Sequence, residues 1–238
     1  MEGLDDFKAM RQATALRPLL GLTVLLVEDS RFACEAVRML CLRSGARIRR
    51  ADSLQSARKH LNVYRPSVVI IDVGLPDGSG LPLIADLARG SPRIDVVLGT
   101  SGDLDAEGEV IAAGADGFLS KPIASLAAFQ SAILAHLPAD RQPPGPRLIS
   151  DEVVEPDRIA FHDDLSHVAE VLRTPATDGS IDYVTQFLGG VARSADDSDL
   201  HDAVHRLKTL RQKGAPLQQG LSQLTDLVES RLAAGGPL

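Results

Sequence analysis

The chain has 238 residues, of which 44% are hydrophobic and only 3% aromatic, and its formal net charge is −7. This length allows one large domain or two modest ones, with cores made mainly of aliphatic side chains. No apolar run approaches the roughly 18 residues of a membrane-spanning helix. The acidic start, MEGLDDFKAMRQ, lacks the basic region followed by an apolar region that a secretion signal carries. We therefore expect a cytoplasmic protein without membrane insertion, in which Cys34 and Cys41 are free thiols in the core.

The first residues, 1–21, carry an apolar residue at every third position. These are Leu4, Phe7, Met10 and Ala13. The spacing favours a short appended helix or a tail, and it indicates no chemistry.

Residues 22–137 alternate between five short, β-branched or apolar runs and five helical patterns. The expected strands are 23–27, 48–51, 68–71, 95–98 and 117–119. The expected helices are 31–44, 54–64, 81–89, 105–113 and 126–137. Strands that alternate with helices require right-handed crossovers, so the pattern predicts an α/β fold with a five-stranded, doubly wound parallel sheet.

The remainder of the chain is different in composition. Residues 138–156 contain five prolines and predict a stiff, extended linker without core residues. Four helical patterns follow, and they predict a small antiparallel four-helix bundle over 157–236. They cover 157–173, 181–193, 198–213 and 217–233. Residues 151–238 hold 15 acidic against 8 basic residues, a balance that disfavours nucleic-acid binding.

Polar side chains follow the central predicted strands. Glu28 and Asp29 come after the first strand, and Asp72 ends the third. Because the carboxyl ends of parallel strands meet at one edge, these three carboxylates should converge there and need a cation. Oxygen ligands without Cys or His select Mg²⁺ or Mn²⁺. Thr100 and Lys121, at the next two strand ends, complete a site for a phosphoryl group, with Asp72 as the nucleophile.

Four motifs in this order resemble the response-regulator receiver domains of two-component signalling. They are VLLVEDS at 24–30, IIDVGLPDGSG at 70–80, GTSG at 99–102 and GADGFLSKPI at 114–123. The resemblance covers about half of the chain and implies a flavodoxin-like fold.

The resemblance implies roles for individual residues. Asp72 would be the phosphoacceptor, Asp29 would bind Mg²⁺ directly, and Glu28 would bind it largely through water. The backbone carbonyl of Gly74 would complete the protein's share of the metal shell. Thr100 would hydrogen-bond a phosphoryl oxygen and move towards it on activation.

On the last strand, the resemblance implies that Lys121 pairs with another phosphoryl oxygen and that the Lys121–Pro122 bond is cis. Phe118 fills the position of the switch aromatic. Two departures from the family pattern are Gly74, where a larger residue is usual, and Ser101, which replaces Ala or Gly. The small Gly74 opens the approach to the phosphoryl group, so we expect this position to affect the lifetime of the acyl phosphate.

The third C-terminal helical pattern, LHDAVHRLKTL, places His205 at the edge of an apolar stripe and Lys208 one turn later. A neutral imidazole beside a cation can accept a phosphoryl group from an aspartyl phosphate. The stretch resembles the core of histidine phosphotransfer domains, with matches at His205, Leu207, Lys208 and the Gly214–Ala215 pair. It is equally similar to the phosphoacceptor helix of histidine kinases.

The same stretch departs from the phosphotransfer pattern. Val204 replaces the usual alanine, and Thr209 and Leu210 stand where small residues let a receiver approach. His205 is therefore either a second phosphosite or a solvated residue of a helical adaptor. The other histidines, His162, His167 and His201, do not form a convincing metal-binding pattern.

Taken together, the sequence predicts a phosphorelay protein whose partner is a histidine kinase or a histidine phosphotransfer protein. Another response regulator and a second copy of the chain are further partners that the pattern allows. The helical part would relay the phosphoryl group, or it would dimerise, or dock or sequester a partner without phosphorylation of His205. A third reading is that it resembles a kinase's dimerising helices and competes for the kinase's regulator. No glycine-rich ATP-binding box is present, so any enzymatic activity would be self-phosphorylation and autophosphatase activity of the receiver.

Overall fold

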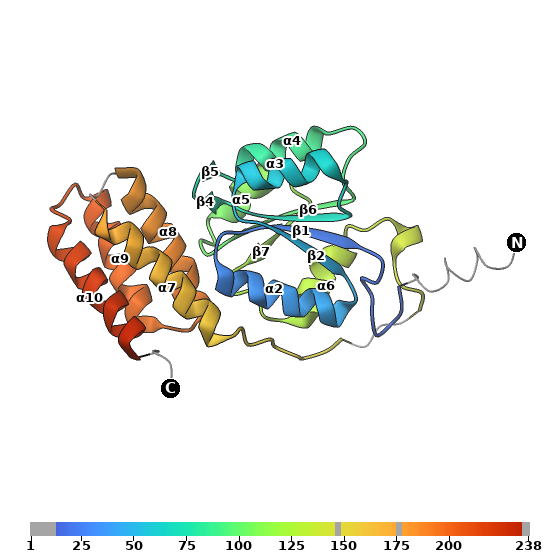
Figure 1. The fold of residues 1–238 in the computed structure, drawn as a ribbon. Coiled ribbons are helices and arrows are strands. Elements are labelled where there is room, and N and C mark those ends of the chain that lie inside the picture. Colours follow the sequence, from blue (N-terminus) through green and yellow to red (C-terminus); the bar gives the residue numbers. More distant parts are fainter. Residues whose placement is uncertain (1–12, 146–148, 175–177, 235–238) are drawn as a thin grey trace, which may run out of the picture. The chain divides into compact units, whose positions relative to one another are not determined.

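The computed structural model describes residues 13–145, 149–174 and 178–234 (Figure 1). The chain divides into two compact units, and the division falls between Glu155 and Pro156, with Ser30–Glu35 grouped with the second unit. Each unit has a hydrophobic core of its own. The expected helix at the N-terminus falls mostly on residues 1–12, which lie outside the described residues, and residues 15–21 form bends and turns.

The first unit is built on a five-stranded sheet whose neighbouring strands are all parallel, in the order β2-β1-β3-β6-β7. The strands are β1 (Thr23–Val27), β2 (Arg47–Ala51), β3 (Val68–Asp72), β6 (Val96–Ser101) and β7 (Gly117–Ser120). All five residues of the central strand β3 are buried, as expected for a strand with helices on both faces. The strand order reverses between β1 and β3, where ligands of such folds bind.

Helices cover both faces of this sheet (Figure 1). They are α2 (Arg31–Ser44), α3 (Leu54–Val63), α4 (Leu81–Arg89), α5 (Ala106–Ala112) and α6 (Leu126–Leu134). Side chains of α3, α4 and α5 share one core with β1 and β3, whereas α2 and α6 lie on the opposite face. Cys34 and Cys41 in α2 are buried free thiols. The prediction of a doubly wound parallel sheet is therefore confirmed, and only the ends of its elements differ by a few residues.

The segments that flank this sheet contribute buried residues. Leu19 is fully buried, and its N–H donates to the carbonyl of Ser44 at the end of α2 (2.9 Å). After α6 the chain forms the short 3₁₀ helix Ala139–Arg141. Val154 is only 2% exposed, so the expectation of a linker without core residues is wrong at this position. The sequence pattern missed it because a single buried valine between prolines and acids has no periodicity.

The second unit contains four helices within the described residues. They are α7 (Arg158–Arg173), α8 (Asp178–Ser194), α9 (Ser198–Gln212) and α10 (Gln218–Ala234). Their apolar stripes meet in one core, with α8 packed against α7 and α9, and α10 packed against the same two helices. Asp157 and Asp197 cap α7 and α9 by accepting backbone N–H bonds. The helical content is confirmed, and the four-helix bundle stays a prediction.

Within the described parts of the chain, no helix has both the length and the apolar character that crossing a membrane requires.

Candidate functional site

The ends of β1 and β3 bring three carboxylates together. Val27 pairs with Ile71 in the parallel register, so Glu28 and Asp29 follow β1 where Asp72 ends β3. One ligand oxygen from each of these three residues lies within 4.8 Å of the other two. Glu28 is 1% exposed and Asp72 is 6% exposed. The predicted acidic cluster is therefore present.

The donor set of this cluster fits a hard divalent cation. Its side-chain ligands are all carboxylate oxygens, which Mg²⁺ and Mn²⁺ prefer. Three carboxylates at this separation, two of them buried and one half-buried, also repel one another unless positive charge offsets them. Glu28, Asp29 and Asp72 are thus the residues that would hold the metal ion. The predicted role of the Gly74 carbonyl stays a prediction, and Gly74 itself lies in the next short strand after Asp72.

Lys121 supplies a positive charge within the cluster. Its Nζ lies 2.6 Å from Oε2 of Glu28 and 2.8 Å from Oδ2 of Asp72, and its side chain is 6% exposed. Burial alone would lower the pKa of Lys121, but the two carboxylates raise it, so the amine is charged. Burial raises the pKa of Glu28 to about 8, and the ammonium of Lys121 opposes that rise. The Lys121–Pro122 bond is cis, as predicted.

Thr100 lies beside Asp72 in the register of β3 and β6. Its side chain is fully buried, and its hydroxyl donates to the carbonyl of Leu119 on β7 (2.7 Å). The predicted bond from this hydroxyl to a phosphoryl oxygen would require the bond to Leu119 to break. Phe118 pairs with Gly99 in the sheet. Its partly buried side chain packs against the core that α3, α4 and α5 share with β1 and β3.

The loop after Asp72 contains a residue that the sequence analysis missed. The hairpin of β4 (Gly74–Leu75) and β5 (Gly78–Ser79) carries Asp77 at its tip. The carboxylate of Asp77 accepts the N–H groups of Leu54 (2.8 Å) and Gln55 (2.9 Å) at the start of α3. These N–H groups have no acceptor within their own helix. Asp77 thus ties the loop to α3, and because 23 residues separate Asp77 from Leu54, no local motif reveals the contact.

Close packing fixes the same loop at Gly80. A Cβ atom at this position would lie 2.2 Å from the carbonyl oxygen of Asp72 and 2.8 Å from the side chain of Ile71. The backbone of Gly80 is in the ordinary right-handed helical region, so the requirement for glycine here is one of space.

In the second unit, His205 is exposed on α9, between Val204 and Leu207, which are buried. Lys208 is exposed as well, one turn later. The helix and its apolar stripe are as predicted. Phosphorylation of His205 stays a prediction.

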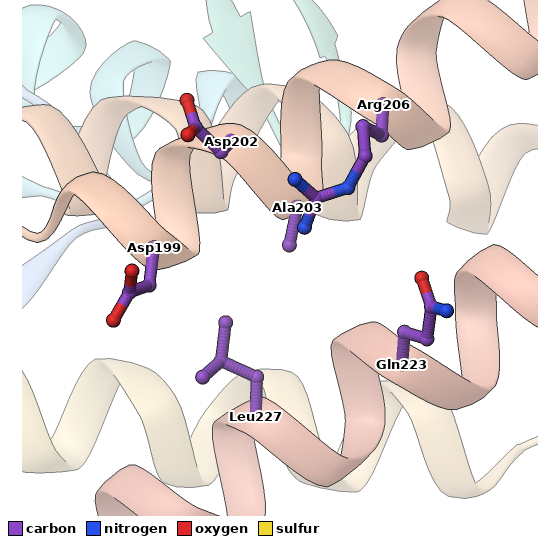
Figure 2. A pocket seen from close by; sticks show the side chains of 6 residues that line it. All are labelled: Asp199, Asp202, Ala203, Arg206, Gln223 and Leu227. Atoms are coloured by element: carbon purple, nitrogen blue, oxygen red, sulfur yellow. The ribbon is translucent and has the colours of Figure 1, made fainter.

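The second unit also has a surface pocket of about 560 Å³ between α9 and α10 (Figure 2). It is lined by Asp199, Asp202, Ala203, Arg206, Gln223 and Leu227. Its walls carry both signs of charge. His205 does not belong to the lining.

Comparison with known proteins identifies part of the first unit. Residues 24–133 match the family model "Response regulator receiver domain". They contain the Glu28, Asp29 and Asp72 cluster with Lys121 beside it. Residues 24–133 form a response regulator receiver domain. Receiver domains belong to two-component signalling, and the acidic cluster lies within the part of the chain that matches this family.

Two curated relatives match over the receiver domain. The KDP operon transcriptional regulatory protein KdpE of Escherichia coli is 34% identical over 99 residues, which are 42% of this chain and 44% of KdpE. The virulence transcriptional regulatory protein PhoP of Salmonella typhimurium is 31% identical over 100 residues, which are 42% of this chain and 45% of PhoP. The chain thus spans less than half the length of these two relatives.

Among solved structures, a putative response regulator from Chloroflexus aurantiacus is 28% identical, with a TM-score of 0.44. The match covers 48% of this chain and 98% of that one.

Proposed function

We propose that the chain is a phosphorelay protein whose receiver domain accepts a phosphoryl group on Asp72. The donor is the phosphohistidine of a histidine kinase or of a histidine phosphotransfer protein. The observation that carries this proposal is the position of the Asp72 carboxylate, which lies within one cluster with Glu28 and Asp29 and 2.8 Å from the Lys121 amine.

In the transfer, a carboxylate oxygen of Asp72 attacks the phosphorus of the phosphohistidine. The new P–O bond forms while the P–N bond breaks, and the departing imidazole takes up a proton. A Mg²⁺ ion held by the three carboxylates would supply positive charge to the phosphoryl oxygens. The amine of Lys121 already donates to Asp72. It therefore contributes a further positive charge that stabilises the equatorial oxygens of the phosphoryl group during transfer.

The helical unit then either relays the phosphoryl group or transmits the state of the receiver. The exposure of His205 and of Lys208 one turn away supports a relay. In the relay, Nε2 or Nδ1 of a neutral imidazole attacks the phosphorus of phospho-Asp72, and the aspartate carboxylate leaves. Leu210, half-buried where the phosphotransfer pattern has a small residue, supports the alternative of a non-catalytic adaptor.

Intact-mass analysis of the full chain with a small phosphodonor and Mg²⁺ tests both steps. We expect one phosphoryl group on wild type, none on Asp72→Ala, and loss of the label with hydroxylamine if it resides on the aspartate alone. A fraction that survives hydroxylamine and alkali, requires Asp72 and disappears in His205→Gln supports the relay. His201→Gln, on the same helix, is the matched control.

Absence of label on the folded wild type, or equal labelling of Asp72→Ala, contradicts the proposed receiver chemistry. Label that is lost completely to hydroxylamine in wild type leaves the receiver chemistry intact and assigns the helical unit to the adaptor alternative.

A further inference from the structure

The last part of the linker is hydrogen-bonded to the receiver domain. We call residues Glu152–Val154 the strap. The carbonyl of Glu152 accepts the N–H of Leu126 (3.0 Å), and the N–H of Val154 donates to the carbonyl of Ala124 (2.9 Å). Between these two bonds, Val153 faces Ser125 in an antiparallel bridge. The strap thus lies against the loop that joins β7 to α6.

Burial and charge add to these backbone bonds. Val154 is 2% exposed, whereas its neighbour Val153 is 63% exposed, so the strap has one face against the protein and one in solvent. The carboxylate of Glu152 also pairs with the guanidinium of Arg43 in the last turn of α2. Leu126 is the first residue of α6, and its N–H has no acceptor within that helix. The strap therefore supplies a hydrogen-bond acceptor to the first turn of α6.

The loop under the strap is the one that delivers Lys121 to the phosphorylation site. The N–H of Lys121 donates to the carbonyl of Ser101 (2.9 Å), and Ala124 follows three residues later. Between them, Ile123 is only 8% exposed, so this short stretch is packed against the domain. Only two residues thus separate Lys121 from Ala124, whose carbonyl accepts the N–H of Val154.

On its other side the strap leads directly into the second unit. Asp157, the N-cap of α7, comes three residues after Val154. The strap also lies beyond residues 24–133, the part of the chain that matches the receiver-domain model. One short segment thus connects the Lys121 loop with the first helix of the C-terminal unit.

We propose that the strap is a coupling element, docked when Asp72 is unphosphorylated and released when it is phosphorylated. The proposal rests on the proposed function of Asp72. In the unphosphorylated state, Lys121 Nζ bonds both Glu28 and Asp72. A phosphoryl group on Asp72 gives this amine a new acceptor, and in the proposed coupling the Lys121 loop moves together with the amine. The strap docks on the loop in its unphosphorylated conformation. The phosphorylated and unphosphorylated receivers therefore differ in their affinity for the strap, and such a difference is what makes a segment act as a switch.

Hydrogen-exchange mass spectrometry on the full chain tests this coupling, with and without a small phosphodonor and Mg²⁺. Intact mass on the same samples reports whether Asp72 is labelled. In wild type we expect the amides of Leu126 and Val154 to exchange faster on phosphorylation, by a factor of at least about three. In Val154→Asp the carboxylate cannot be buried at this position, so both amides should exchange at least about tenfold faster in either state.

Val153→Asp is the matched control, because its side chain is exposed, and it should behave like wild type. Arg43→Gln removes the ion pair to Glu152 without placing a charge in the core. This variant should raise the exchange rates of Leu126 and Val154 by less than Val154→Asp does. It should also leave the receiver folded, so it tests the coupling even if Val154→Asp unfolds the domain.

Labelled Asp72 with unchanged exchange at Leu126 and Val154 in wild type overturns the coupling and leaves the proposed function standing. Equal behaviour of Val154→Asp and Val153→Asp also overturns it, because the strap would then not be docked in solution. Absence of label overturns the proposed function, and the coupling with it.

Discussion

The hydroxyl of Thr100 donates to the main-chain carbonyl of Leu119 at 2.7 Å, in a fully buried position beside Asp72. The residue expected to bind a phosphoryl group is thus bonded to β7, the strand that ends directly before Lys121. Before it can turn towards Asp72, this bond to β7 has to break. Thr100 therefore links β6 to the strand that ends directly before Lys121.

Replacing Thr100 by valine keeps the branched shape and removes this bond. We expect Thr100→Val to lower the free energy of unfolding by about 1 kcal/mol, because the Leu119 carbonyl loses a buried donor. Labelling of Asp72 should continue, since its cluster is intact. Urea unfolding followed by circular dichroism measures the loss, and Thr100→Ser, which keeps the hydroxyl, is the control. A valine variant as stable as wild type contradicts a stabilising role of this bond.

Lys121 and a divalent cation compete to neutralise the same carboxylates. Removing the ammonium in Lys121→Met should therefore tighten Mg²⁺ binding by at least roughly tenfold, because a positive charge close to the metal site is lost. Asp72→Asn should weaken binding, because one charged ligand is lost. Isothermal titration calorimetry measures both, with Lys59→Met, an exposed change in α3, as the control. Weaker Mg²⁺ binding by Lys121→Met would show that the amine organises the carboxylates and does not compete with the metal.

Gly80 and Gly108 should respond in opposite ways to the same substitution. Gly80→Ala places a Cβ atom 2.2 Å from the Asp72 carbonyl oxygen, and we expect it to cost at least about 2 kcal/mol of stability. It should also slow labelling of Asp72, whose backbone must move. Gly108, exposed within α5, has no heavy atom within 4 Å of an added Cβ, and Gly108→Ala should stabilise the protein by about 0.5–1 kcal/mol. Equal effects at the two glycines would refute the argument from space.

Asp197 makes a pH-dependent contribution to the stability of the C-terminal unit. It caps α9 through the N–H of Leu200 (3.1 Å) and accepts a bond from Nε of Arg231 on α10 (2.8 Å). The hydrogen bond from Arg231 lowers the pKa of Asp197 below its usual 3.8. A lowered carboxyl pKa stabilises the fold above about pH 4, and this contribution is lost as pH falls through the folded-state pKa.

We therefore expect Asp197→Ala to cost about 1–2 kcal/mol at pH 7. The deficit relative to wild type should shrink as the pH falls below 4, as measured by urea unfolding across a pH series. Asp199→Ala removes an exposed partner of the same arginine, and it should cost less than about 1 kcal/mol at any pH. A deficit for Asp197→Ala that is constant down to pH 2 would mean that the ionised carboxylate is not what stabilises the cap.

The sequence predicted the sheet and its acidic edge for a simple physical reason. Wholly apolar runs such as 68–71 are typical of buried parallel strands, and the chain places carboxylates directly after two of them. Parallel pairing then brings Asp29 and Asp72 together without any knowledge of side-chain packing. The four C-terminal helices were predictable in the same way, from periodic leucines and from capping residues such as Asp157.

What the sequence could not provide are contacts between distant segments that leave no local pattern. Asp77 caps a helix that begins 23 residues earlier, and an aspartate in a turn is explained equally well by the turn alone. The bond from Thr100 to Leu119 depends on the exact pairing of β6 with β7. Val154 was missed because a single buried valine has no periodicity, and its place depends on backbone bonds to the loop after Lys121, which is distant in the sequence.

The strap has a consequence for the modularity of this chain. Leu19, Leu137 and Val154 are all at most 4% exposed, yet they lie outside residues 24–133. A fragment cut at those limits would leave apolar surface uncovered and the first turn of α6 without one of its acceptors. A chimaera that exchanged this receiver for another would separate Glu152 from Arg43. A graft that kept these contacts would have to extend from Leu19 to Glu155.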